Sequence, residues 1–201
     1  MPHPFRDPPV KRHIVVIQGH PDRDARHFGH ALADAYERGA VAGGHEVRRI
    51  DVAALDFPLV RSRREWDEVP PPAIQQAQAS IAWADHLCII HPLWLGSMPA
   101  LLKGFLEQVF REGFALRKSK LGAAAGLRGR SARVIVTMGM PALLYRFFFL
   151  SHGVRSMVRS ILRLTGFGPV RTTMIGSVER GDHGRKVRWL ERIQSLGNAA
   201  R

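Results

Sequence analysis

The stretch that decides the expected fold is ADHLCIIHPLWLGSMPALLKGFLEQVF, residues 84–110. Residues 85–91 contain an apolar run without polar alternation, which is typical of a parallel strand covered on both faces. After a segment bounded by Pro92 and Pro99, apolar residues recur at helical spacing and predict an amphipathic helix over residues 101–110. A buried strand followed directly by a helix predicts one unit of an α/β protein.

The same order of strand and helix recurs along the chain in both directions. Further strands are predicted at residues 13–18, 45–52, 132–137 and 170–175, and further helices at about 25–42, 72–83, 152–164 and 185–196. The pattern predicts a single α/β domain over residues 13–201, a doubly wound five-stranded parallel sheet with helices on both faces. Residues 1–12 are expected to form a flexible N-terminal arm, residues 57–72 a surface loop and residues 117–130 a mobile segment.

The composition is that of an ordinary globular protein, with 45% hydrophobic residues in 201. The longest apolar runs fall far short of the roughly 20 residues that a membrane span needs. The single cysteine, Cys88, lies in an apolar run and is expected to be a buried structural thiol. Together with an N-terminus that lacks the apolar stretch of a signal peptide, it favours a cytoplasmic location.

Positive charge is concentrated in the second half of the chain. Residues 1–116 hold 13 Lys and Arg against 14 Asp and Glu, whereas residues 117–201 hold 17 against three. A basic half can attract phosphate-bearing cofactors, anionic lipid or nucleic acid, or it can serve only solubility. Nucleic acid is not expected as a partner, because the sequence lacks the aromatic and basic pattern of a single-strand groove.

The loop after the first predicted strand is GHPDRDARHF, residues 19–28. In an open parallel sheet, ligands bind beyond the carboxyl ends of the strands. This loop leads into a helix N-terminus, whose free amides and dipole favour a phosphate, and Arg23, Arg26 and His27 can supplement them. The alternative is that Asp22 or Asp24 caps the helix and the arginines are solvated.

The loop after the third predicted strand places Trp94 between two prolines in HPLWLGSMP, residues 91–99. Such a stiff, apolar segment can lie along the edge of a planar ring and offer its amides to ring oxygens and nitrogens. The alternative is a tryptophan that packs in the core.

The loop after the fourth predicted strand is TMGMP, residues 137–141, followed by Tyr145 and His152. Small residues after a strand allow a flat ligand to approach the backbone. Tyr145 and His152 can donate protons or hydrogen bonds at a redox centre, although lone Tyr and His residues are more often packing or surface groups.

Three segments, residues 14–28, 84–110 and 134–152, resemble the NAD(P)H:quinone oxidoreductase family, flavodoxin-like flavoproteins that include mammalian quinone reductases and bacterial drug-activity modulators. The middle segment is the most specific, because Pro-Leu-Trp, Met-Pro-Ala-Leu-Leu-Lys-Gly-Phe and Glu-x-Val-Phe follow in family order. The resemblance covers about residues 13–178 and implies a flavodoxin-like fold.

The resemblance also implies a set of site residues. The flavin phosphate and ribityl chain would contact His20, Arg26, His27 and Phe28. The isoalloxazine would be flanked on one side by Pro92, Leu93, Trp94, Leu95 and Gly96, and on the other by Thr137, Met138, Gly139 and Met140. The residues that steady charge during hydride transfer would be Tyr145 and His152.

The activity implied is transfer of a hydride from NAD(P)H through a flavin, FAD or FMN, to a quinone or a similar electrophilic small molecule. The resemblance further implies a homodimer, with residues 143–167 as a candidate wall of the interface or of the acceptor pocket. No metal is expected. The alternative is a flavin-binding accessory protein of a membrane transporter, with the basic C-terminal half at an anionic partner or a membrane surface.

Overall fold

The computed structural model describes residues 10–119, 122–180 and 182–201 and confirms the predicted flavodoxin-like α/β architecture. Five parallel strands form one sheet in the order β2-β1-β3-β6-β7, the flavodoxin-like order in which the strand sequence reverses beside β1. The strands are β1 (His13–Gln18), β2 (Glu46–Asp51), β3 (His86–Pro92), β6 (Ser131–Thr137) and β7 (Val170–Ile175). Most of the predicted N-terminal arm, residues 1–9, lies outside the described residues.

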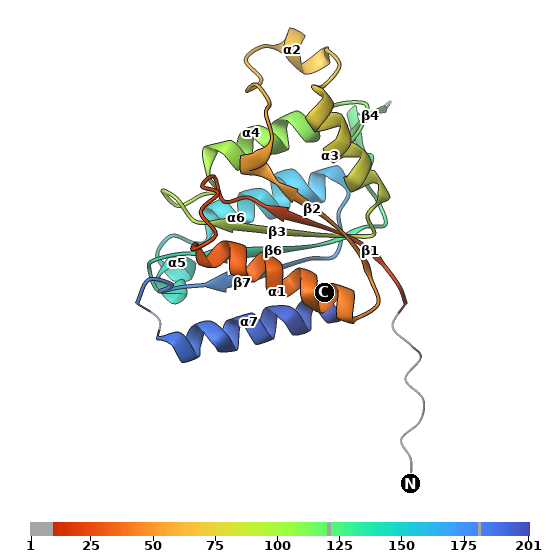
Figure 1. Cartoon of the computed structure of the whole chain (residues 1–201). Coiled ribbons are helices and arrows are strands. Elements are labelled where there is room, and N and C mark those ends of the chain that lie inside the picture. The colour runs from red at the N-terminus through yellow and green to blue at the C-terminus, as the bar shows by residue number, and fades with distance from the viewer. Residues whose placement is uncertain (1–9, 120–121, 181) are drawn as a thin grey trace.

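Helices cover both faces of this sheet, as Figure 1 shows. One face packs against α1 (Phe28–Ala42) and α7 (His183–Asn198). The other packs against α3 (Pro72–Trp83), α4 (Ala100–Val109) and α6 (His152–Ser156), which continues as the π-helix η2 (Met157–Arg163). The short elements are η1 (Val52–Ala54), α2 (Arg63–Asp67) and α5 (Ala142–Phe147).

Two local expectations differ from the structure, and a third segment contains strands that were not predicted. Residues 57–72 contain α2, whose N-terminus is capped by the Ser62 hydroxyl accepting from the Glu65 amide at 3.2 Å. The segment expected to be mobile contains an antiparallel pair, β4 (Leu116–Ser119) with β5 (Gly122–Ala125). Helix α1 begins at Phe28, about three residues later than predicted, because Asp22 and Asp24 bind the backbone of the preceding loop.

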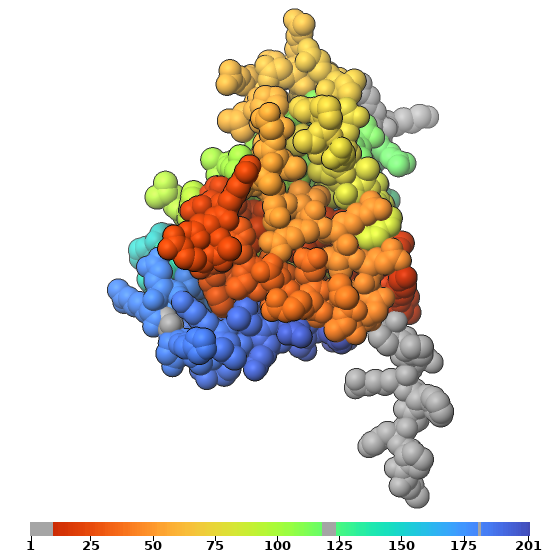
Figure 2. Space-filling view, viewed as in Figure 1, coloured from red at the N-terminus to blue at the C-terminus, as the bar shows by residue number. Residues whose placement is uncertain are grey.

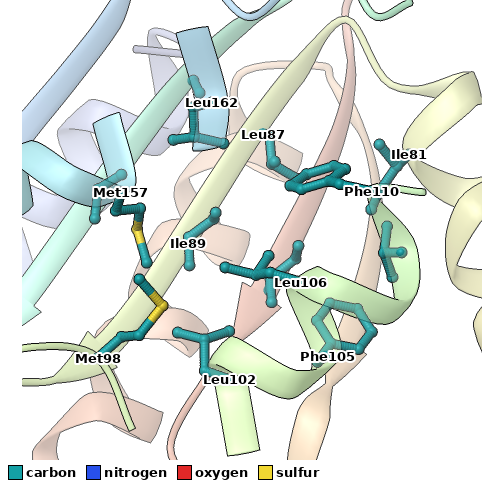
Figure 3. Packing of buried hydrophobic residues seen from close by; sticks show 14 of the residues in the cluster. Ile81, Leu87, Ile89, Met98, Leu102, Phe105, Leu106, Phe110, Met157 and Leu162 are labelled. Carbon is teal, nitrogen blue, oxygen red and sulfur yellow. The ribbon is translucent and has the colours of Figure 1, made fainter. Parts of the chain in front are cut away.

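The core consists of one hydrophobic cluster on each face of the sheet. Strands β3 and β6 are buried along their whole length, which explains their lack of polar alternation. Figure 3 shows the larger cluster, which includes Ile89 of β3, Leu102 and Leu106 of α4, and Met157 and Leu162 of η2. Each fully buried side chain of this size contributes about 1.5–3 kcal/mol, so the strands form a rigid platform for the loops at their ends.

Helices α1 and α7 touch through their backbones at glycines. A Cβ atom at Gly39 would lie 1.9 Å from the main-chain oxygen of Gln194, and one at Gly197 would lie 2.1 Å from that of Tyr36. Only glycine allows such an approach. On the same face, Cys88 is a buried free thiol, as predicted, and burial raises the pKa of that thiol. Among the described residues, no helix has both the length and the apolar character that a membrane crossing requires.

Candidate functional site

A cleft of about 460 Å³ lies beyond the carboxyl ends of the parallel strands. It falls within the range of small-molecule sites, which is about 300–1,000 Å³. Its walls come from the loops after β1, β3, β6 and β7 and from the start of α7. In Figure 2 the loop after β1, in red, stands out at this end of the molecule above the blue C-terminal segments. The lining residues are His20, Asp22, Arg26, His27, Phe28, Gly29, Pro92, Leu93, Trp94, Thr137, Met138, Gly139, Val178, Glu179 and Lys186.

The N-terminus of α1 opens into this cleft without a side-chain cap. His27 occupies the capping position but makes no capping hydrogen bond, and no acidic residue stands in the first turn. The capping alternative is therefore wrong for both aspartates: Asp22 accepts from the Asp24 amide at 2.9 Å, and Asp24 accepts from the Arg26 amide at 3.0 Å. The first amides of α1 have the geometry and dipole that favour a phosphate.

Arg26 and Lys186 bring positive charge to the lining of the cleft. The Arg26 guanidinium is highly exposed and binds the Asp24 carboxylate, with Nε 2.9 Å from Oδ2. The hydrogen bonds to Asp24 raise the pKa of Arg26, which is charged throughout the working range. An incoming phosphate would therefore compete with Asp24 for Arg26.

Three histidines gather around Asp22 below this helix end. The rings of His20 and His27 stack with centroids 4.1 Å apart, and His30 lies 5.6 Å from His20. His20 Nδ1 lies 3.1 Å from both the amide and the oxygen of Asp22, so either tautomer of the ring has a backbone partner. Burial, and then the charge of His27, lowers the pKa of His20. No group of three or more metal-ligating side chains arranged to hold an ion occurs in the described ranges.

The loop after β3 forms a two-residue turn that presents Trp94. Trp94 and Ser97 exchange two backbone hydrogen bonds of 2.9 Å, and the central residues Leu95 and Gly96 both have positive φ, 46° and 79°. The amides of Leu93 and Trp94 are bonded inside the protein, to the oxygens of Thr137 and Ser97. The wall of the cleft is therefore the half-exposed indole of Trp94 rather than these two amides.

The loop after β6 supplies the facing wall. A Cβ atom on Gly139 would have the Glu179 carboxylate at 3.4 Å as its nearest neighbour, so the flexible Glu179 side chain lies against this glycine. Thr137 and Met138 are buried at the end of β6, and the Met138 amide donates to the Ile175 oxygen at 2.9 Å.

Tyr145 and His152 lie behind the Trp94–Ser97 turn and do not line the cleft. Tyr145 is fully buried, and its hydroxyl donates to the Gly96 oxygen at 3.0 Å. His152 is exposed, and its Nδ1 bonds the Phe149 oxygen at 3.0 Å. Their rings are 6.3 Å apart. Of the other residues predicted to bind the cofactor, Leu95, Gly96 and Met140 also lie outside the lining, whereas the rest contribute to it.

The sequence prediction missed Asp22, Gly29, Val178, Glu179 and Lys186 as lining residues. The last three follow β7, whose carboxyl end shares the ligand-binding edge of the sheet. The rule that ligands bind beyond the carboxyl ends of parallel strands also predicts this loop, when it is applied to every strand and not only to β1, β3 and β6.

Two buried side chains under the cleft keep an unpaired polar nitrogen, Gln18 Nε2 at the end of β1 and His91 Nε2 at the end of β3. The other ring nitrogen of His91, Nδ1, lies 2.8 Å from the Pro92 oxygen and donates to it, and burial lowers the pKa of His91 to about 4. An uncapped helix end, an indole and the backbone at Gly139, all lining one cleft, together fit a planar ligand that carries a phosphate.

Comparison with known proteins agrees with this geometry. Residues 12–196 match the family described as having a flavodoxin-like fold, and the chain belongs to that family. It is 27% identical over 170 residues to an uncharacterized NAD(P)H oxidoreductase of Haemophilus influenzae, covering 82% of this chain and 83% of the relative.

Two solved structures share the fold. An NAD(P)H:quinone oxidoreductase from Methanothermobacter marburgensis has a TM-score of 0.79 at 23% identity, covering 94% of this chain and 96% of the other. An FMN-dependent NADH-azoreductase from Bacillus anthracis, in complex with FMN, has a TM-score of 0.73 at 12% identity, covering 92% and 96%. The resemblance expected from the sequence is confirmed at the level of family and fold.

Proposed function

We propose that this protein is a flavin-dependent oxidoreductase that takes a hydride from NAD(P)H and passes it to a quinone or a similar electrophilic small molecule. The observation that carries the proposal is the uncapped N-terminus of α1, which opens into a cleft walled by Trp94 and Gly139. The names of the relatives as NAD(P)H and quinone oxidoreductases support the same chemistry.

Different residues of the cleft would contact different parts of a flavin. The first amides of α1, with His27 and the stacked ring of His20 beside them, would bind the phosphate. The indole of Trp94 and the backbone at Gly139 would contact the ring system. A bound flavin supplies the hydride chemistry, while these groups position it and exclude water.

Tyr145 acts on this site as a positioning residue and His152 as a group on the acceptor side. The Tyr145 hydroxyl holds the Gly96 oxygen and thereby fixes the turn that carries Trp94. The Nδ1–H of His152 is directed to Phe149, which leaves Nε2 as a hydrogen-bond acceptor at the molecular surface. We propose that His152 contacts the electron acceptor from behind the turn.

A second copy of this chain is the proposed partner, bound through the exposed apolar face of α5 and the residues after it. The large side chains on this face lie beside the site, and monomers rarely expose so many together. They are Leu143, Leu144, Phe147, Phe148 and Leu150.

The comparisons give no support to the transporter-accessory alternative. The single buried thiol favours a cytoplasmic location.

The absorption spectrum of the purified protein tests the proposal, with anaerobic bleaching on addition of NADH or NADPH as the activity readout. Bound FMN and FAD are separated after release from the protein. A colourless protein that takes up neither flavin on reconstitution would overturn the proposal.

Substitution of Trp94 tests the position of the ring. Trp94→Ala is expected to weaken flavin binding about tenfold, which corresponds to about 1.4 kcal/mol of lost stacking. Trp83→Ala is the matched control, because Trp83 stacks on His13 at the opposite end of the sheet, with centroids 4.3 Å apart. Equal flavin affinity in both variants would mean that the loop after β3 does not cradle the ring.

Sedimentation equilibrium tests the dimer. Phe148→Glu places a charge on the apolar face and is expected to shift the protein to monomers, whereas Arg188→Glu, on exposed α7, is expected to leave the mass unchanged. A monomeric wild-type protein at all concentrations would refute the interface and leave the flavin site untouched.

A further inference from the structure

A second pocket, of about 420 Å³, lies at the end of the sheet opposite the cleft, where the parallel strands begin. It collects the residues before β1 and β2, the first residues of β6 and β7, and the end of α7. In Figure 1 this is the right-hand end of the sheet, beside the marked C-terminus. The lining residues are Val10, Arg12, His45, Ser131, Pro169, Arg171, Ala199, Ala200 and Arg201.

Strand register places cations side by side behind this pocket. His86 of β3 pairs with Ser131 of β6, and Arg133 of β6 pairs with Arg171 of β7. All four side chains share the face of the sheet that α1 and α7 cover, because Cys88 and Ile135 on the same alternation belong to that cluster. Like charges directly opposite one another across two strands are destabilising, so an anion bound beside the arginine pair would stabilise it.

Arg133 has side-chain partners within the protein, whereas Arg12 and Arg171 have none among the described residues. The guanidinium of Arg133 donates to the main-chain oxygen of Arg201 and to Thr173 Oγ1, the latter at 2.7 Å. If the Arg201 oxygen is counted as part of a carboxylate, that group neutralises only one of the positive charges of the arginine pair. Within the described ranges, the side chains of Arg12 and Arg171 make neither a hydrogen bond nor an ion pair.

The groups around the two outer arginines add no negative side chain. His45 Nδ1 accepts from the Arg12 amide at 3.3 Å, and His45 Nε2 lies 3.1 Å from the Asn198 oxygen. No Asp or Glu occurs among the described residues of the lining. The local potential is positive enough that, after burial, the charges of Arg12, Arg133 and Arg171 help to lower the pKa of His86 to about 3.

We propose that this pocket is a binding site for a small molecule that carries a phosphate or diphosphate group. Guanidinium groups bind phosphate oxygens in pairs, and the Ser131 hydroxyl adds a further donor at the pocket wall. The pocket is larger than a bare phosphate requires, and Val10, Pro169 and Ala199 give it an apolar side, so the ligand carries an organic part. The site is separate from the flavin cleft, since the two lie at opposite ends of the strands.

Calorimetric titration of the full chain with inorganic phosphate and with pyrophosphate, at an ionic strength fixed with chloride, tests the site. Pyrophosphate is expected to bind once per chain more tightly than phosphate. Arg171→Gln and Arg12→Gln are each expected to weaken pyrophosphate binding at least tenfold. Both side chains are exposed, so either variant carries the test if the other fails to fold.

Two control variants distinguish binding in this pocket from general charge attraction and from binding in the cleft. Arg159→Gln removes the same charge from η2 on the other face of the sheet and is expected to leave binding within twofold of wild type. Arg26→Gln, titrated without flavin, tests whether the loop before α1 is the true binding site. Equal losses of pyrophosphate binding in Arg159→Gln and Arg171→Gln would mean that binding reflects general charge attraction. A loss confined to Arg26→Gln would place the binding in the cleft. Absence of pyrophosphate binding by the wild-type protein would refute the proposal. None of these outcomes depends on whether the protein oxidises NAD(P)H.

Discussion

Two buried histidines make the folded protein sensitive to mild acid. Burial lowers the pKa of His86 to about 3 and that of His91 to about 4, from the ordinary value of 6.5. Below pH 6.5 these two histidines are therefore protonated in the unfolded chain and remain unprotonated in the folded chain. The contribution of both groups to stability is complete above pH 6.5 and is lost as the pH falls toward the folded-state values.

The size of the effect follows from these pKa values. At pH 5, about 1.5 units below the unfolded-state pKa, each histidine costs the folded state about 2 kcal/mol, at 1.36 kcal/mol per unit. His86 and His91 together remove about 4 kcal/mol between pH 7.5 and pH 5. That is a large share of the 5–15 kcal/mol typical of a domain.

Urea unfolding followed by circular dichroism at a series of pH values measures this loss. His91→Asn keeps a donor toward the Pro92 oxygen and is expected to remove about half of the pH dependence, as is His86→Asn, which keeps a partner for Ser131. The readout is the slope of the free energy of unfolding against pH, not the absolute stability of either variant. A wild-type protein equally stable at pH 7.5 and pH 5, or variants with an unchanged slope, would refute the assignment of these two rings as buried and neutral.

Three further substitutions probe packing, positioning and capping. Gly39→Ala forces α1 and α7 apart and is expected to lower the free energy of unfolding in urea by at least about 2 kcal/mol. The control Gly184→Ala, also in α7, meets only flexible side-chain atoms and should be neutral or slightly stabilising. Equal stability of the two variants would contradict the backbone contact. Tyr145→Phe removes the hydrogen bond to the turn that carries Trp94, with an expected loss of about 1–2 kcal/mol and weaker flavin retention by fluorescence titration; unchanged flavin affinity would argue against a positioning role. Asp182→Ala deletes the N-cap of α7 and is expected to lower stability by about 1 kcal/mol in thermal unfolding, a change that Asp182→Asn should largely avoid.

The sheet could be predicted from sequence because its central strands are apolar on both faces. The runs at His13–Gln18 and Ser131–Thr137 are bounded to within a residue of their predicted limits. The missed elements lack that signal. Helix α5 exposes most of its large side chains, and β4 and β5 pair through their backbones in a Gly- and Ala-rich segment, so neither leaves an apolar period in the sequence.

The site was predictable at the level of loops and less so at the level of atoms. Strand ends identify His20, Trp94 and Gly139 as neighbours, and all three line the cleft. The sequence contains no sign that the Leu93 and Trp94 amides are already bonded, or that the Tyr145 hydroxyl faces backward to Gly96. Those facts depend on how a turn closes on a distant strand, which is a property of three-dimensional packing.

The pocket where the strands begin has a practical consequence for work on this protein. Val10 and Arg201, which are far apart in the sequence, both line it. A purification tag or fusion partner joined directly at Arg201 would stand at this pocket, and an oligohistidine tag there would add imidazoles to a region that is already rich in positive groups. Untagged material, or a tag inserted in an exposed loop far from this pocket, is the preparation in which this end of the molecule can be studied.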